Sequence, residues 1–208
     1  MQNQKTLATE IAATNVTFDD YLENYAADYH EWLEGTVYKM SPIHERHDEL
    51  TRYLATLFMA YFDAKPIGRI RQAPFVMRFK EYNIAREPDI QVILQANYDK
   101  LKPTFMDGAA DICIEVVSLE SIERDHGTKF LEYEMGGVAE YWVVDPIHDE
   151  SRFFRLNADR KYVAQREDQD GNYQTPRLPG FTLHVPTLWT DPLPGFSAIA
   201  EAVKAMLS

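Results

Sequence analysis

Apolar side chains recur every three or four positions over residues 44–64, which predicts a long amphipathic helix packed on a core. A shorter helix is expected at 16–26, where Thr17 is a candidate N-cap and acidic residues occupy the first turn. Two further helices are expected, one at 123–135 before a pair of glycines and one at 196–207 with an amphipathic pattern.

Strand-like segments alternate with these helices. Alternating or continuous apolar runs occupy 69–80, 87–94, 111–118, 138–146 and 180–185, and hairpins are expected at 29–41 and 151–167. The strand at 111–118, the next helix and the strand at 138–146 form one unit, which implies a right-handed crossover and parallel pairing. The predicted fold class is α/β, with a mixed central β-sheet flanked by helices and extra β-hairpins.

Length and composition are those of one globular domain. The 208 residues show no internal repeat and no clear linker, so a single domain over 1–208 is expected. The single cysteine, Cys113, excludes an intramolecular disulfide, and its place in an apolar run indicates a core residue. No apolar segment approaches the roughly 20 residues that span a bilayer, and no signal-peptide pattern is present. We therefore expect a cytoplasmic protein without membrane contacts.

The chain is acidic, with 33 Asp and Glu against 21 Lys and Arg and a net charge of −12. Non-specific binding to nucleic acid relies on Lys and Arg that neutralise phosphates, so this charge disfavours it. A modest concentration of basic residues is found at Arg69, Arg71, Arg78, Lys80 and Arg86. These side chains are expected to line one side of the sheet near Asp89.

Two acids stand in segments otherwise built for burial. Asp89 is expected just inside a strand, after Pro88, and Glu115 lies late in a nearly continuous apolar strand. Two buried carboxylates on neighbouring strands repel each other unless a cation lies between them, and Mg²⁺ prefers such oxygen ligands. The alternative is that each acid meets water at a strand end or pairs with Arg86 or Arg124.

Lys129 is the third candidate. Asp125, Lys129 and Tyr133 stand four positions apart and form one row on the predicted helix, so Asp125 and Lys129 alone would make an ordinary surface pair. The helix follows the Glu115 strand closely, however, and a short connection would bring the lysine back to the carboxylates. Asp111 shares the strand face of Glu115, either as a further ligand or as a polar residue at the strand entrance.

Four segments, "MSPIHERHDEL", "REPDIQVI", "DICIEVVS" and "DHGTKFLEYEMGGVAEYWVVDP", together resemble the Uma-two family of restriction-endonuclease-like proteins. This family belongs to the PD-(D/E)XK nuclease superfamily, and the resemblance runs from about residue 18 to 188. The usual superfamily pattern places a lysine two residues after the strand glutamate, where this chain has Val117. In the family that it resembles the lysine has moved to the next helix, where Lys129 takes its place.

The resemblance implies a restriction endonuclease-like core and a specific set of site residues. It implies that Asp89 and Glu115 bind Mg²⁺, with Mn²⁺ as a substitute, and that Lys129 is the catalytic lysine. An acid of the long helix often completes such a site, which makes Glu49, or Glu45 one turn earlier, a candidate.

Two further residues match the family pattern. His47 lies where the family has its helix histidine, and it would orient substrate phosphate or a water, unless it is simply an exposed residue at the helix start. Ser118 would cap the following segment or hydrogen-bond to the site.

The resemblance therefore implies a Mg²⁺-dependent endonuclease that hydrolyses phosphodiester bonds of nucleic acid, with DNA as the expected substrate and a homodimer as the expected assembly. The acidic composition implies that the nucleic acid is bound weakly. Two other functions fit the same residues. One is a non-catalytic binding or assembly module that keeps the nuclease fold. The other is a hydrolase of small phosphate compounds, which suits the acidic composition.

Overall fold

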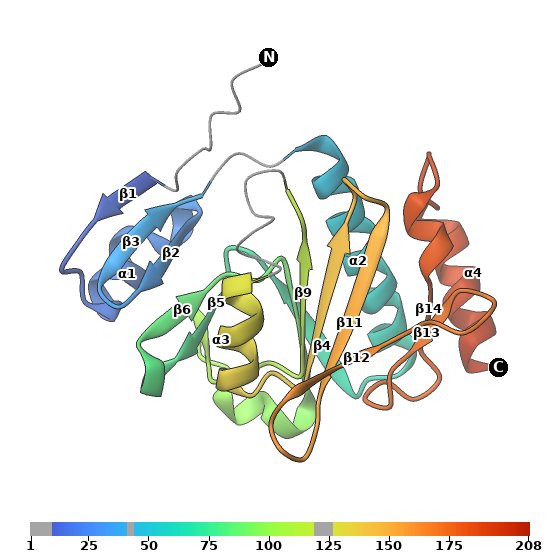
Figure 1. The fold of residues 1–208 in the computed structure, drawn as a ribbon. Helices are drawn as coiled ribbons and strands as arrows, with labels where there is room; N and C mark the ends of the chain where they lie inside the picture. Colours follow the sequence, from blue (N-terminus) through green and yellow to red (C-terminus); the bar gives the residue numbers. More distant parts are fainter. Residues whose placement is uncertain (1–9, 41–43, 119–126) are drawn as a thin grey trace.

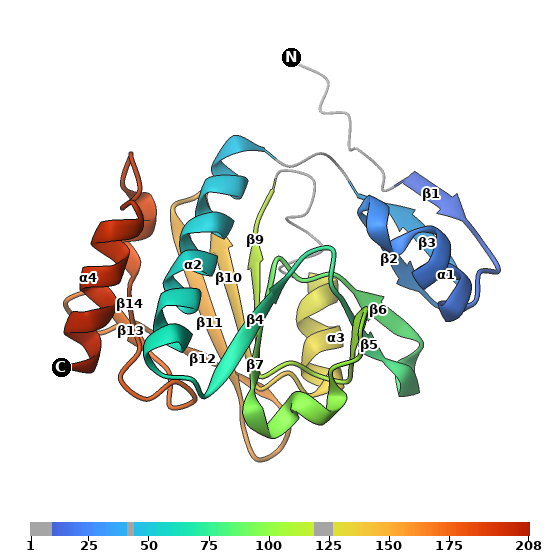
Figure 2. The same cartoon turned by 180° about the vertical axis from the view of Figure 1, so that it is seen from behind.

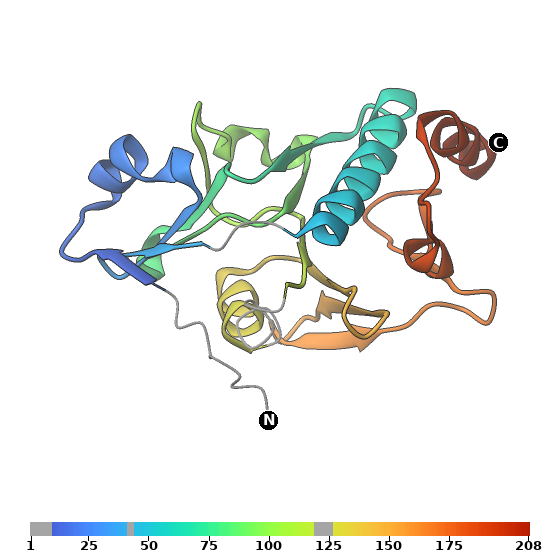
Figure 3. The same cartoon turned by 90° about the horizontal axis from the view of Figure 1, so that it is seen from above.

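The structure is a computed structural model that describes residues 10–40, 44–118 and 127–208. Two six-stranded sheets form its framework, and helix α3 (Lys129–Gly136) lies between them (Figures 1 and 2). Viewed from above, the first and last helices, α1 (Phe18–Asn24) and α4 (Phe196–Leu207), lie at opposite ends of the molecule (Figure 3). The mixed α/β class expected from the sequence is confirmed.

The central sheet has the strand order β12-β11-β10-β9-β7-β4. Its strands are β4 (Gly68–Gln72), β7 (Ile90–Leu94), β9 (Ile112–Val116), β10 (Glu140–Asp145), β11 (Glu150–Leu156) and β12 (Tyr162–Gln165). Strand β9 pairs with β10 in parallel and with β7 antiparallel, so the sheet is mixed. The crossover through α3 therefore joins neighbouring parallel strands, as predicted.

The second sheet has the strand order β1-β3-β2-β6-β5-β8. Its strands are β1 (Glu10–Ala13), β2 (His30–Leu33), β3 (Thr36–Lys39), β5 (Val76–Phe79), β6 (Ile84–Arg86) and β8 (Phe105–Asp107). The predicted hairpin at 29–41 is its β2–β3 pair, and the turn uses positive φ angles of 48° at Glu34 and 84° at Gly35. The hairpin is thus part of a full sheet, which the local pattern did not indicate.

Two sequence predictions about strands are corrected. The run at 69–80 is not one strand, because the chain leaves the central sheet after β4 and enters the second sheet at β5. Asp89 lies one residue before β7 rather than inside it. Strand β6 and the small pair β13 (Asn172–Gln174) and β14 (Thr182–His184) complete the sheets, although only β14 was expected.

Each face of the central sheet is covered by one helix that the sequence predicted. Helix α2 (Glu45–Ala64) packs on the face formed by Ile112, Ile114 and Val116. Helix α3 packs on the opposite face, because successive strand residues point to opposite sides and Cys113 joins the cluster around Tyr133. The expected start of this helix near residue 123 lies outside the described residues.

Helix α3 ends at two glycines, Gly136 and Gly137, which allow a left-handed cap and a close contact with a neighbouring strand. Gly137 adopts a φ of 85°, a left-handed cap that residues with a side chain rarely adopt. At Gly136 an added Cβ would lie 2.4 Å from the Phe79 ring of the second sheet. The close approach of Gly136 to Phe79 packs the end of α3 against the second sheet. No helix among the described residues is long and apolar enough to cross a membrane.

Gly136→Ala should therefore destabilise the protein by about 1–3 kcal/mol, because the new methyl group overlaps a buried ring. Chemical denaturation monitored by circular dichroism measures this change. Gly127→Ala is the matched control, since an added Cβ there meets no described atom within 4 Å. Equal stability of the two variants would contradict the close packing of α3 on Phe79.

Candidate functional site

Glu115 is the buried acid at the centre of the candidate site. It lies on β9, is only 2 % exposed, and points to the α3 side of the sheet together with Cys113. The Cys113 thiol is part of the core: burial raises its pKa, and its Sγ contacts Met77 Sδ at 3.6 Å. The prediction that Cys113 is a core residue is confirmed, and Glu115 is the group of this face that needs a charged partner.

That partner is Lys129, the first residue of α3. Its Nζ lies 3.0 Å from Glu115 Oε2, and the lysine is 3 % exposed. One turn later on the same helix, the Tyr133 hydroxyl donates a hydrogen bond of 2.6 Å to Glu115 Oε1. The expected convergence of the strand acid and the helix lysine is therefore confirmed, whereas Asp125 lies outside the described residues.

Asp89 reaches the same edge of the sheet from the neighbouring strand. The β7–β9 register pairs Ile90 with Ile114, so one residue further along it sets Asp89 opposite Glu115. The Val116 amide donates to Asp89 Oδ2 at 2.7 Å, and His47 Nε2 lies 3.1 Å from the same oxygen. Asp89 Oδ1 makes no hydrogen bond within the described part of the chain, and the side chain is 17 % exposed.

His47 is thus drawn into the site by helix α2, and it is buried rather than exposed at the helix start. Glu49 is not drawn in: its side chain is 43 % exposed and pairs with Arg46 at 3.1 Å. Glu45, at the first position of the helix, is also exposed. The helix therefore contributes a histidine to the site, and neither of its candidate acids reaches Asp89 in this structure.

The second sheet supplies two charged residues to the site: Glu31, which sequence reasoning missed, and Arg86, which it named as a possible partner of the acids. Glu31 of β2 is 1 % exposed, and its Oε1 lies 3.4 Å from Lys129 Nζ. Arg86 of β6 donates to Glu31 Oε2 at 2.6 Å and holds both oxygens of Glu132 on α3, at 2.7 and 2.8 Å. Lys129 is therefore flanked by carboxylates from two different sheets.

The electrostatics of this group follow from its burial. Desolvation alone would lower the pKa of Arg86, but Glu31 and Glu132 outweigh it and raise that pKa above its usual value. Burial, together with the nearby Glu115, raises the pKa of Tyr133, so its hydroxyl stays a donor to that carboxylate. Arg86 and Tyr133 thus remain in the protonation states that the geometry requires.

Glu87 is a second buried acid beside the site, and it is protonated at neutral pH. Burial raises its pKa to about 9. The Tyr21 oxygen lies 2.7 Å from both Glu87 Oε1 and the carbonyl oxygen of His30. The single hydroxyl proton of Tyr21 can serve only one of these contacts, so the other requires a proton on Glu87.

Other predicted residues have structural roles. Asp111 lies at the far end of β9 from Val116 and accepts hydrogen bonds from Leu94 N and Asn97 Nδ2 at 2.8 and 3.0 Å. Ser118 directly precedes residues 119–126, which lie outside the described part of the chain. Arg124, the other arginine considered as a partner of the acids, lies within that segment. Tyr141 and Trp142 are fully buried core residues, as expected.

The expected basic lining near Asp89 is wrong for Arg86. Arg86 is buried in ion pairs, and three of the other side chains lie over aromatic rings. These are Arg69 over Tyr98, Arg71 over Phe75 and Arg78 over Phe18. Alternation along the strands did not reveal the burial of Arg86, because the sequence alone does not distinguish an exposed arginine from a buried one.

The donor set fits a small hard cation. Asp89 and Glu115 present carboxylates from opposed positions of the β7–β9 register, and Asp89 Oδ1 accepts no hydrogen bond within the described part of the chain. Mg²⁺ requires few protein ligands, because it keeps several waters and shares substrate phosphates. Within the described residues no group of three or more His, Cys, Asp or Glu is arranged to hold a metal, so a dedicated protein cage is absent there.

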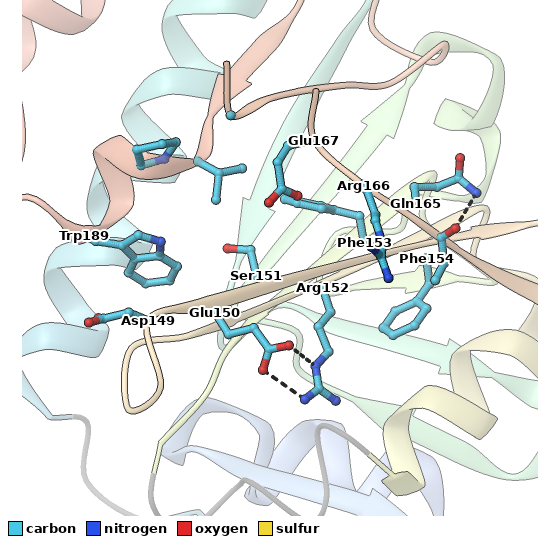
Figure 4. A pocket seen from close by; sticks show the side chains of 14 residues that line it. Asp149, Glu150, Ser151, Arg152, Phe153, Phe154, Gln165, Arg166, Glu167 and Trp189 are labelled. Carbon is cyan, nitrogen blue, oxygen red and sulfur yellow. Dashed lines mark hydrogen bonds and ion pairs between the residues drawn. The ribbon is translucent and has the colours of Figure 1, made fainter. Parts of the chain in front are cut away.

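A surface cavity of about 520 Å³ lies elsewhere, over β11, β12 and the 3₁₀ helix at Val185–Trp189 (Figure 4). Its lining includes Trp189 and the ion-paired side chains of Glu150 and Arg152, drawn with dashed lines in the figure. Asp89, Glu115 and Lys129 do not line it, so the cavity is separate from the candidate site.

The fold and the site together define a restriction-endonuclease-like α/β protein, in which neighbouring strands bring two acids to one edge and the crossover helix supplies a lysine. The family model Uma2, described as "Putative restriction endonuclease", matches residues 17–186, and the chain belongs to this family. The strand and helix segments that carry Asp89, Glu115 and Lys129 all lie within the matched range. The expected family and the nuclease-like class are thus confirmed.

A solved structure supports the fold assignment. The crystal structure of a putative nuclease belonging to DUF820 from Anabaena variabilis ATCC 29413 is similar to this chain, with a TM-score of 0.70 and 16 % sequence identity. The similarity covers 84 % of this chain and 97 % of that one, so the shared fold includes nearly the whole neighbour. None of the curated proteins compared with this chain matches it.

Arg86→Leu should destabilise the protein by about 3–5 kcal/mol, because it leaves Glu31 and Glu132 buried without their shared cation. Urea unfolding followed by tryptophan fluorescence measures this loss. Arg152→Leu provides the control: it breaks the exposed pair with Glu150, for which about 0–1 kcal/mol is expected. A small effect of Arg86→Leu would show that the buried group does not need its arginine.

Glu87→Gln should become increasingly more stable than the parent protein as pH rises from about 5 to about 9. The unfolded glutamate loses its proton near pH 4.5, whereas the folded one keeps it to about 9, so deprotonation favours the unfolded state across this window. Glutamine has no such proton to lose. Thermal unfolding of both proteins over this pH range measures the difference, and parallel curves would contradict a protonated Glu87.

Proposed function

We propose that the protein is a Mg²⁺-dependent endonuclease that hydrolyses phosphodiester bonds of DNA. The observation that carries the proposal is the approach of the Lys129 ammonium to 3.0 Å from Glu115, with Asp89 facing Glu115 across the same strand pair. Membership of the Uma2 family supports phosphodiester hydrolysis as the reaction class. Two acids and a lysine are also the groups that such a reaction needs, since its main demand is the stabilisation of negative charge.

The roles of the residues follow from their positions. Asp89 and Glu115 would hold Mg²⁺, and Asp89 Oδ1 would be the first ligand because Oδ2 already accepts from the Val116 amide and faces His47. When bound, the cation would polarise a phosphoryl oxygen and increase the acidity of water. Lys129 would donate hydrogen bonds toward the charge that develops on the phosphate.

His47 has a positioning role in this proposal. Its Nε2 contact with Asp89 Oδ2 would orient the carboxylate and leave Oδ1 for the cation. This assignment differs from the expectation that His47 orients substrate phosphate or a water. Glu49 would join the site only after leaving Arg46, and we leave it out of the proposed ligand set.

Substrate binding should be weak and sensitive to salt. The net charge is −12, and Arg86 is occupied in buried ion pairs. Fewer phosphates are then neutralised by protein cations than in a protein with a basic face. We expect a homodimer to present two such sites to the two strands of DNA.

The experiment that tests the function is an incubation of the purified protein with supercoiled plasmid, single-stranded DNA and single-stranded RNA. Each reaction contains Mg²⁺, Mn²⁺ or a chelator, and a parallel series contains nucleoside triphosphates. Metal-dependent cutting of plasmid supports the proposal. Turnover of nucleotides alone would indicate a hydrolase of small phosphate compounds. No turnover with any substrate would instead favour a non-catalytic binding or assembly module.

Asp89→Asn should reduce cleavage by about 100-fold or more, because a neutral amide weakens metal binding while it preserves an acceptor for the Val116 amide. Lys129→Ala should reduce the rate to a similar extent. Initial cleavage rates and thermal unfolding are measured together. Lys161→Ala is the control, since this exposed lysine lies just before β12 and pairs with Glu134 of α3. Full activity of Asp89→Asn would remove that carboxylate from the mechanism.

A further inference from the structure

The position of Lys129 depends on a residue of the second sheet. Its ammonium lies 3.0 Å from Glu115 of the central sheet and 3.4 Å from Glu31 of strand β2. Glu31 and Glu115 are each almost fully buried, at 1 % and 2 % exposed. A cation between two buried carboxylates is attracted to both, so Glu31 limits how far the lysine can swing around Glu115.

Glu31 is in turn held in place by Arg86 of the neighbouring strand β6. The β2–β6 register pairs Trp32 with Ala85, and one residue further along it sets Glu31 opposite Arg86. Arg86 Nη1 donates to Glu31 Oε2 at 2.6 Å, which leaves Oε1 directed toward Lys129. The planar guanidinium also grips both oxygens of Glu132, so its own orientation is fixed.

These contacts close a ring through helix α3. Glu132 lies three residues after Lys129, so the two side chains are neighbours on one face of the helix. One of them meets Glu31 directly and the other meets it through Arg86. The first turn of α3 is therefore attached to the second sheet at two points, while Tyr133 attaches it to Glu115 of the central sheet.

We propose that Glu31 is a positioning residue that holds the Lys129 ammonium beside Glu115, which makes the N-terminal hairpin a functional part of the site. Lysine has a long flexible stem, and a displacement of about 1 Å in a reacting group can cost about 100-fold in rate. The catalytic consequence rests on the proposed function. The placement of Lys129 by Glu31 does not rest on it and can be measured separately.

The test uses Glu31→Gln, which keeps the volume and removes the charge. Arg86 retains Glu132 and Lys129 retains Glu115, so the variant keeps part of the ring. Native-state acetylation of lysines, read by mass spectrometry, reports how often Lys129 leaves its buried position. Lys129 should be labelled about tenfold faster in Glu31→Gln than in the parent protein, because local opening becomes easier.

Glu134→Gln is the matched control. It is the same substitution on helix α3, and its carboxylate pairs with Lys161 at 2.6 Å and accepts from the Tyr162 amide. This variant should leave the labelling of Lys129 unchanged. Glu31→Asp, which keeps the charge on a shorter stem, should give an intermediate labelling rate and serves as the second variant if Glu31→Gln does not fold.

Cleavage kinetics supply the second readout. Glu31→Gln should lower kcat by about 10- to 100-fold with KM within about twofold, because the lysine acts on the reacting phosphate rather than on initial binding. Parent-like labelling of Lys129, or a parent-like kcat, would overturn the proposal. If the parent protein cleaves no nucleic acid, the proposed function fails, and the labelling result alone still decides whether Glu31 holds Lys129.

Discussion

The structure depends on one physical constraint: five charged side chains are buried where the two sheets meet across helix α3. Each charge taken out of water is costly, and the cost is offset only when a partner of opposite sign lies at the correct distance. Lys129 and Arg86 meet this condition for the three glutamates around them. A shift of either sheet relative to α3 would separate these pairs, so the charges select one arrangement of the apolar surfaces around them.

The same constraint explains why the site is formed by elements distant in the sequence. The long helix brings His47 to Asp89, the crossover helix brings Lys129 to Glu115, and the N-terminal hairpin brings Glu31 to Lys129. Asp89 is the most exposed of these acids and keeps one oxygen without a hydrogen bond among the described residues. The site thus combines almost fully buried glutamates with one partly exposed aspartate.

Much of the fold and the centre of the site were predictable from the chain. The helices and the outer hairpin follow from local periodicity, which depends on residues close in sequence. The parallel strand pair follows from the order strand, helix, strand along the chain. The pairing of Glu115 with Lys129 followed from the short connection between strand and helix together with the family resemblance. Glu49 was a candidate to complete the site, but in the structure it pairs with Arg46 instead. Helical spacing shows which residues share a face and does not show whether a nearby arginine will bind one of them.

The sequence by itself determined the elements, the α/β class and the residues with the chemistry for the site. Only the tertiary structure decided that β4 and β5 enter different sheets, and that Glu31 and Arg86 become buried partners. The physical reason is that local pattern records which side chains are polar, whereas burial of a polar side chain depends on surfaces brought from elsewhere in the chain. From the sequence, Glu31 in its hairpin has the pattern of a solvent-exposed residue. In the folded protein it is buried, and its role depends on Arg86 and Lys129, which other elements bring to it.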